Sequence, residues 1–217
     1  MADSERAILE SGLASLSIPY SDHQITLLLR YLDLIERWNK AYNLTAVRGR
    51  ENWLVRHLLD SLAVLPFLRG KRVIDVGTGA GLPGIPLAIM QPATLFSLLD
   101  SNGKKTRFLF QVQTQLALSN VTIIDARVEA YRPAKTFDVV ISRAFGSLTK
   151  LVNICEHLLS NNGCYLAMKG AMVEDEVMTL QQSAADGRLM TSVHALRVPG
   201  LDESRCVVEL AFMRGQE

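Results

Sequence analysis

The chain has 217 residues, of which 48% are hydrophobic and 21% charged, with a formal net charge of +1. This length and composition predict one substantial hydrophobic core with room for a small helical extension. The near-neutral charge excludes a protein that binds nucleic acid by charge alone. No apolar run reaches the length of a membrane span, and the amino-terminal residues lack the pattern of a signal peptide, so a soluble cytoplasmic protein is expected.

The cysteines and histidines give no sign of a metal site. Cys155, Cys164 and Cys206 are odd in number and widely spaced, without a C-x-x-C pair, and the four histidines are equally scattered. This usage favours a reducing compartment and predicts that no metal is bound.

Residues 1–68 have the pattern of a helical extension, and residues 69–217 are expected to form one compact unit. Ser21 and Gln24 have capping-box spacing ahead of an apolar face at helical intervals. A third helix is predicted near residues 51–62. Between Arg48 and Arg72 the chain carries six basic and two acidic residues, which indicates either a basic patch or a solvated helix face.

After residue 72, strands and helices alternate. Strands are predicted near 72–76, 94–99, 121–124, 137–142 and 163–168, and helices near 84–90, 103–118 and 148–159. That order is typical of a parallel sheet with helices on both faces. Two further β-rich stretches, 189–198 and 205–213, are joined by a connection too short for a crossover helix. They are expected to form an antiparallel hairpin that closes the sheet.

The run from Val73 to Gly84 (VIDVGTGAGLPG) predicts a small-molecule site. A β-favouring segment leads into alternating glycines, and an apolar helix pattern follows. Such a turn has no room for side chains and brings free backbone N–H groups to a ligand. A glycine turn without a ligand is the alternative.

Two ligands fit the glycines. Gly79, Gly81 and Gly84 match the dinucleotide fingerprint, so an NAD-dependent oxidoreductase is one candidate. Asp75 argues against NAD, because its carboxylate is expected beside the ligand and would repel a pyrophosphate. Two prolines at the helix start also remove donors that a phosphate needs. The ammonium group of S-adenosylmethionine (AdoMet) would instead pair with Asp75.

Asp100 supports an adenosine ligand of either kind. It ends the second predicted strand, where its carboxylate is placed to accept both ribose hydroxyls. The alternative role for Asp100 is the N-cap of the following helix. A parallel sheet that ends in an antiparallel hairpin fits AdoMet methyltransferases better than dehydrogenases.

Five segments, in this order along the chain, resemble the bacterial 16S ribosomal RNA guanine-N7 methyltransferase family, RsmG, also called GidB. They are WNKAYNLT at 38–45, HLLDSL at 57–62, the glycine run, LDSNGKK at 99–105 and ISRAF at 141–145. The resemblance covers nearly the whole chain. It implies a Rossmann-like class I AdoMet-dependent methyltransferase fold, with AdoMet as donor and one guanine N7 in the 530 loop of 16S RNA as acceptor.

The resemblance also implies cofactor contacts at Gly77 and Leu82 in the turn, at Val128 and Glu129 after the third strand, and at Arg143 after the fourth. Glu129 stands where this family reads the adenine, and its alternative role is an exposed acid at a helix start. For Arg143 the alternative is a salt bridge with Asp75 or Glu129.

The expected chemistry needs no acid or base residue. Guanine N7 offers a lone pair that needs no deprotonation, so the protein has only to arrange an in-line approach. The sequence also lacks the Asn/Asp-Pro-Pro-Tyr/Phe motif of amine methylation and the Pro-Cys pair of cytosine carbon methylation. Arg143 is expected to position the cofactor carboxylate or an RNA phosphate. Phe145 is expected to pack in the core or to stack on the guanine.

RNA contacts are predicted from six polar or basic residues: Asn43, Arg48, Arg56, His57, Lys169 and Arg205. For Asn43 and His57, hydrogen bonds that fix the helical extension are an equal alternative. The low net charge predicts weak binding to naked RNA, so a monomer is expected to act on 16S RNA within an assembled or assembling small subunit. A non-catalytic module that binds AdoMet or RNA is a third interpretation.

Overall fold

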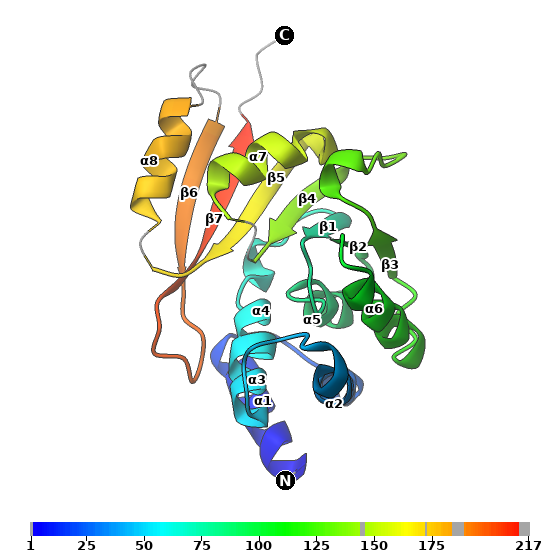
Figure 1. The fold of residues 1–217 in the computed structure, drawn as a ribbon. Coiled ribbons are helices and arrows are strands. Elements are labelled where there is room, and N and C mark those ends of the chain that lie inside the picture. Colours follow the sequence, from blue (N-terminus) through cyan, green and yellow to red (C-terminus); the bar gives the residue numbers. More distant parts are fainter. Residues whose placement is uncertain (1, 144–145, 172, 184–188, 213–217) are drawn as a thin grey trace.

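The computed structural model describes residues 2–143, 146–171, 173–183 and 189–212. Its centre is a seven-stranded sheet of order β3-β2-β1-β4-β5-β7-β6 (Figure 1). The strands are β1 (Arg72–Val76), β2 (Leu95–Asp100), β3 (Val121–Asp125), β4 (Phe137–Ser142), β5 (Leu159–Lys169), β6 (Leu189–Leu196) and β7 (Arg205–Phe212). The first five pair in parallel, whereas β7 runs antiparallel to both β5 and β6. The predicted mostly parallel sheet with a carboxyl-terminal hairpin is confirmed.

Each face of the sheet has its own hydrophobic core. Successive side chains of a strand point to opposite faces, so Val73 of β1 lies in one cluster and Ile74 in the other. The same alternation separates Val139 from Val140 on β4. Both faces of the parallel strands β1 and β4 at the centre are therefore buried, as expected for a parallel sheet covered by helices.

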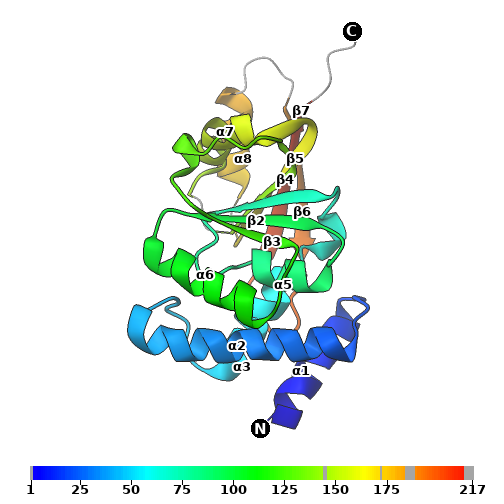
Figure 2. The same ribbon diagram turned by 90° about the vertical axis from the view of Figure 1, so that its right-hand side faces the viewer.

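Helices cover the two faces in pairs (Figure 2). The helices α5 (Gly84–Met90) and α6 (Gly103–Gln115) lie on one face, and α7 (Leu148–Cys155) and α8 (Glu174–Ser183) lie on the other. The first three confirm predicted helices. The sequence analysis missed α8, although Val173, Val177 and Leu180 recur at helical spacing and its first turn is acidic.

The extension begins with α1 (Ala2–Ser15) and α2 (Asp22–Tyr42). The predicted capping box is confirmed: the Gln24 N–H donates to Ser21 Oγ at 3.3 Å, and the Ser21 N–H donates to Gln24 Oε1 at 2.9 Å. The helix ends at Asn43, whose φ of 48° is left-handed. Figure 2 shows α2 lying across α5 and α6 on the side away from the sheet.

The third helix is continuous but changes from α-helical to π-helical hydrogen bonding and back. It consists of α3 (Arg50–Trp53), a π-helical segment η1 (Leu54–Leu59) and α4 (Asp60–Leu62). Short 3₁₀ turns follow elsewhere: η2 (Leu65–Phe67), η3 (Val128–Ala130) and η4 (Glu156–Leu158). Leu28 of α2, Leu58 of η1 and Val73 of β1 belong to one buried cluster. The extension and the sheet therefore share a core across residue 68.

No helix in the described part of the chain combines the length and apolarity that crossing a membrane requires.

Candidate active site

The glycine turn connects β1 to α5 at the carboxyl edge of the sheet. Its backbone has positive φ at Gly77 (70°), Gly79 (62°) and Gly81 (95°), a conformation that side-chain-bearing residues rarely adopt. The Gly77 N–H donates to the Leu99 carbonyl at 2.8 Å, and the Gly79 N–H donates to Asp100 Oδ2 at 2.9 Å. The turn is therefore tied to the end of β2.

Most backbone N–H groups of the turn donate hydrogen bonds to acceptors within the protein. The N–H groups of Gly81 and Leu82 both donate to the Thr78 carbonyl at 2.9 Å, and the Gly84 N–H donates to Asp75 Oδ2 at 2.9 Å. The expectation of free N–H groups facing a ligand is wrong at these positions. A dinucleotide needs such donors for its pyrophosphate, so the geometry disfavours NAD.

The glycines differ in the space around them. A Cβ at Gly81 would lie 2.6 Å from Ile85 Cγ1, and one at Gly84 would collide with Leu98 Cδ2. At Gly79 the nearest atom would be 3.8 Å away. Packing within the protein thus requires glycine at two positions, whereas a Cβ at Gly79 would make only ordinary van der Waals contacts, and it is the positive φ that favours glycine there.

Asp75 is buried rather than open to solvent. Its Oδ2 accepts hydrogen bonds from Thr78 Oγ1 (2.6 Å) and from the Gly84 N–H, while Oδ1 has no partner within the described ranges. Burial raises the pKa of Asp75 to about 6, against the opposing effects of these hydrogen bonds and of Arg143. The prediction of a carboxylate open beside the ligand is therefore wrong, because Oδ2 holds the turn to α5 and Oδ1 is itself buried.

The carboxylate of Asp100, at the end of β2, is fixed by contacts to both of its oxygens. Its Oδ1 accepts from the Asn102 N–H at 2.9 Å, its Oδ2 accepts from Gly79, and Lys105 Nζ lies 3.7 Å from Oδ2. The N-cap of α6 is Asn102, whose side chain accepts from the Lys104 N–H at 3.0 Å. The alternative of Asp100 as that cap is therefore wrong.

A cavity of about 190 Å³, called here the smaller cavity, lies beside this turn. It is lined by Gly77, Leu99, Asp100, Ser101, Ala126, Arg127, Val128, Glu129, Lys150 and Ile154. It joins the ends of β1, β2 and β3 and brings together four predicted cofactor residues from distant parts of the chain. Pockets for complete drug-sized ligands usually measure about 300–1,000 Å³, so this one suits a part of a cofactor, such as an adenosine.

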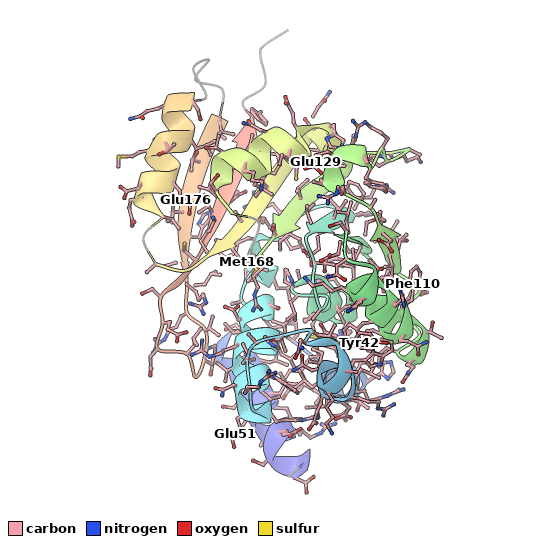
Figure 3. The ribbon with its side chains drawn as sticks, viewed as in Figure 1. Tyr42, Glu51, Phe110, Glu129, Met168 and Glu176 are labelled. Carbon is pink, nitrogen blue, oxygen red and sulfur yellow. The ribbon has the colours of Figure 1, made fainter. Side chains whose placement is uncertain are left out.

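The residues of the smaller cavity fit that group. Asp100 has a fixed carboxylate for ribose hydroxyls, and Glu129, labelled in Figure 3, is an exposed acid on η3. Val128 is buried beneath it. An adenosine would find polar groups at the sugar edge and an apolar surface from Val128 and Ile154.

Arg143 follows β4 and faces the extension. Its Nη1 donates to the Arg56 carbonyl at 3.0 Å and lies 3.5 Å from Asp60 Oδ2. The alternative of a salt bridge with Asp75 or Glu129 is wrong, since the partner is Asp60. The sequence analysis did not single out Asp60, although it lies in the HLLDSL segment that carries the family resemblance.

A second cavity of about 420 Å³, called here the larger cavity, opens beside Arg143. It is lined by Asp60, Arg143, Gly146, Met168, Lys169, Gly170, Leu196, Arg205 and Cys206. Figure 3 labels Met168 in this wall and Glu129 in the smaller cavity. The structure therefore brings together Arg143 and two predicted RNA contacts, Lys169 and Arg205.

Three of the predicted RNA contacts already have acidic partners. Lys169 Nζ lies 2.8 Å from Glu176, and Arg205 Nε lies 3.2 Å from Asp60. Arg56 pairs with both carboxylate oxygens of Glu203, at 2.6 and 2.7 Å. These pairs neutralise much of the positive charge around the larger cavity.

Arg56 does not line the larger cavity, and neither do the other three predicted RNA contacts. His57 is 1% exposed, its Nε2 lies 3.0 Å from Thr45 Oγ1, and burial lowers its pKa to about 4. This favours the alternative, a side chain that fixes the extension. Asn43 ends α2 with an exposed side chain, and Arg48, also exposed, donates to the Thr45 carbonyl at 3.2 Å.

The basic run between residues 48 and 72 does not form one patch. Arg50 contacts the carboxylates of Glu5, Asp33 and Glu36. Arg72 donates to backbone carbonyls at the other end of the sheet. Phe145 lies outside the described residues. Within those residues no three His, Cys, Asp or Glu side chains gather to hold a metal ion.

Residues 24–206 match the family model for rRNA small subunit methyltransferase G (GidB). A protein of that name from Saccharophagus degradans is 50% identical over 204 residues, covering 94% of this chain and 90% of that protein. Its counterpart from Salmonella paratyphi B is 52% identical over 196 residues, covering 90% and 93%. The chain belongs to the rRNA small subunit methyltransferase G family.

Solved structures share the fold of this rRNA small subunit methyltransferase G family member. A SAM dependent methyltransferase from Aquifex aeolicus has a TM-score of 0.57 at 16% identity, covering 77% of this chain and 96% of that chain. M. jannaschii TYW2, in complex with AdoMet, has a TM-score of 0.56 at 19% identity, covering 78% and 80%. The expected Rossmann-like AdoMet methyltransferase fold is confirmed, and a dehydrogenase is not favoured.

Proposed function

We propose that this chain transfers a methyl group from AdoMet to one guanine N7 in the 530 loop of small-subunit ribosomal RNA. Its family makes it an AdoMet-dependent ribosomal RNA methyltransferase. The observation that carries the proposal is the pair of cavities at the carboxyl edge of the sheet. The smaller one suits an adenosine, and the larger one carries Arg143 and further cations.

The cofactor side is held by carboxylates. Asp100, oriented by the N–H groups of Gly79 and Asn102, would accept from the ribose hydroxyls, and Glu129 would take the adenine amino group. The buried Oδ1 of Asp75 is the remaining acceptor for the ammonium group. AdoMet, when bound, supplies a methyl group on a positively charged sulfur, which a neutral nitrogen lone pair can attack.

The acceptor side is the larger cavity. Arg143, Lys169 and Arg205 in its wall suit the phosphates that flank an extruded base. Guanine N7 is an acceptor in the major-groove edge and needs no proton removed. The protein therefore has to hold base and donor in line, at roughly 3–3.5 Å, and no side chain is assigned as acid or base.

The substrate is proposed to be 16S RNA within an assembled or assembling small subunit, acted on by a cytoplasmic monomer. The ion pairs of Arg56, Lys169 and Arg205 support an RNA substrate within a subunit over protein-free RNA. Naked RNA binds mainly through counterion release by free cations, and these three already have acidic partners. The affinity then comes from complementarity to the shape of the subunit surface and not from free positive charge.

The test is methyl transfer from labelled AdoMet to small subunits that lack the modification, followed by mass mapping of the modified nucleoside. We expect 7-methylguanosine in the 530 loop and little transfer to protein-free RNA. Transfer to another nucleoside would contradict the proposed acceptor, equal transfer to protein-free RNA would contradict the proposed substrate form, and no transfer at all would indicate a binding module.

Arg143→Ala is expected to reduce this transfer by about a hundredfold or more, because the site loses its positioning cation. Arg30→Ala is the matched control. Arg30 donates to the Gln115 carbonyl at the end of α6 opposite its N-cap Asn102, so its loss should leave transfer at the wild-type rate. Wild-type transfer by Arg143→Ala would remove Arg143 from the site.

A further inference from the structure

We infer that Asp60 is a positioning residue of the methyl-transfer site, which holds Arg143 and Arg205 in the wall of the larger cavity. The inference rests on the proposed function. Asp60 itself is expected to contact neither cofactor nor RNA, and to act through the two guanidinium groups.

The contacts of Asp60 come from three distant parts of the chain. Its side chain is 5% exposed and belongs to α4, whereas Arg143 follows β4 and Arg205 begins β7. Oδ2 lies 3.5 Å from Arg143 Nη1, and Oδ1 lies 3.2 Å from Arg205 Nε. One carboxylate therefore ties two cations of the cavity wall to the helical extension.

The π-helical segment provides a second contact to Arg143, through a backbone carbonyl. The Asp60 N–H donates to the carbonyls of Val55 and His57, not to that of Arg56, its partner in a regular α-helix. The Arg56 carbonyl accepts instead from Arg143 Nη1 at 3.0 Å. Such π turns within α-helices often lie at functional sites. Here the turn presents a carbonyl and a carboxylate to the same guanidinium nitrogen.

The charges around Asp60 favour a role in positioning the arginines over a role in stabilising the fold. Arg56, Arg143 and Arg205 face the two carboxylates of Asp60 and Glu203. This group therefore keeps one net positive charge, which is available to a phosphate or a cofactor carboxylate. Burial raises the pKa of Asp60 and outweighs the opposing effect of Arg143 and Arg205. A buried ion pair of this kind is weak evidence for a stabilising role, because desolvation offsets the attraction.

The test combines Asp60→Asn with Arg143→Lys in a double-mutant cycle, using kcat and KM for methyl transfer to small subunits. Asn keeps the size of Asp60 but loses the charge. We expect Asp60→Asn to lower kcat by about ten- to a hundredfold. Arg143→Lys keeps a charge and residual activity, but its side chain ends one bond short of the position of Nη1 and is expected to lose these contacts. The double variant should therefore be no slower than the slower single variant.

Multiplicative losses in the cycle, or a wild-type kcat for Asp60→Asn, would overturn the inference. Glu5→Gln is the matched control. Glu5 pairs with Arg50 of the same third helix at 2.9 Å, with 17% side-chain exposure, and it should keep the wild-type kcat. If Asp60→Asn does not fold, Asp60→Glu replaces it in the test, because the added methylene displaces the carboxylate. Its expected result is a reduced kcat at an unchanged Tm, and a wild-type kcat contradicts the inference.

Failure of the proposed function is distinguishable from failure of this inference. If the wild-type protein does not methylate small subunits, the proposed function fails before any variant is compared. If it does so and Asp60→Asn is equally fast, only the positioning role is contradicted.

Discussion

Replacing Asp75 by asparagine is expected to stabilise the unliganded protein at neutral pH. Burial raises the pKa of this carboxyl from 3.8 to about 6. Since one pKa unit corresponds to about 1.4 kcal/mol, the ionised form lowers the free energy of unfolding by about 3 kcal/mol at pH 7. The asparagine oxygen can accept the same bonds from Thr78 and Gly84. Its amide, however, would be a buried donor without a partner, at a cost of about 1–3 kcal/mol. The net gain expected is up to about 2 kcal/mol.

The pH dependence of this difference is the sharper readout. Because the folded pKa of Asp75 is raised, the folded wild-type protein binds a proton more readily than the unfolded chain between pH 6 and 4. The wild type therefore gains stability as the pH falls through this range, whereas asparagine does not titrate. The advantage of the variant should shrink by about 2.4 kcal/mol between pH 7 and 4, because more than half of the unfolded carboxyl is still ionised at pH 4, and it should change sign.

Urea unfolding of both proteins at pH 7, 5.5 and 4 measures the difference, and subtraction removes the titration of all other groups. A difference that is independent of pH would refute the buried, proton-binding carboxyl on which the reasoning depends.

Calorimetry at neutral pH tests the functional half of this prediction. Loss of a charge-assisted hydrogen bond to the ammonium group should weaken AdoMet binding about tenfold or more. Asp138→Asn is the matched control, because Asp138 also accepts two backbone N–H bonds, from Lys71 and Arg72, but at the amino end of β1. It should keep the wild-type affinity for AdoMet, whereas wild-type affinity in Asp75→Asn would remove Asp75 from the cofactor site.

Two further predictions concern the glycine turn. Tyr31→Phe should lower the free energy of unfolding by about 1–3 kcal/mol in urea titrations, because the buried hydroxyl donates to the Ala80 carbonyl at 2.5 Å and its loss leaves that acceptor without the bond; an unchanged midpoint would contradict this. Gly84→Ala should lower the thermal midpoint through a collision with Leu98 costing about 1–3 kcal/mol or more, and a midpoint equal to that of the wild type would show that α5 can shift away from the sheet.

The sequence alone was sufficient for the fold class and for the order of the strands and helices apart from α8. The Ser21 capping box, the alternation of strands and helices after residue 72 and the terminal hairpin are local patterns, set by residues only a few positions apart. The glycine run located the turn that is proposed to bind the cofactor for the same reason, since positive φ and close packing restrict the choice of residue within that segment.

Only the tertiary structure determined which charged groups of the site contact one another. Arg143 meets the Arg56 carbonyl across 87 positions of the chain, and Arg205 meets Asp60 across 145. The burial of Asp75, and the pairing of Arg56 with Glu203 across 147 positions, likewise depend on elements distant in sequence. Such contacts form where helices and strands pack together, and no pattern along a single element specifies which charged groups will then face each other. The local sequence therefore determined the elements and the turn, and their packing determined the partners of each charged group.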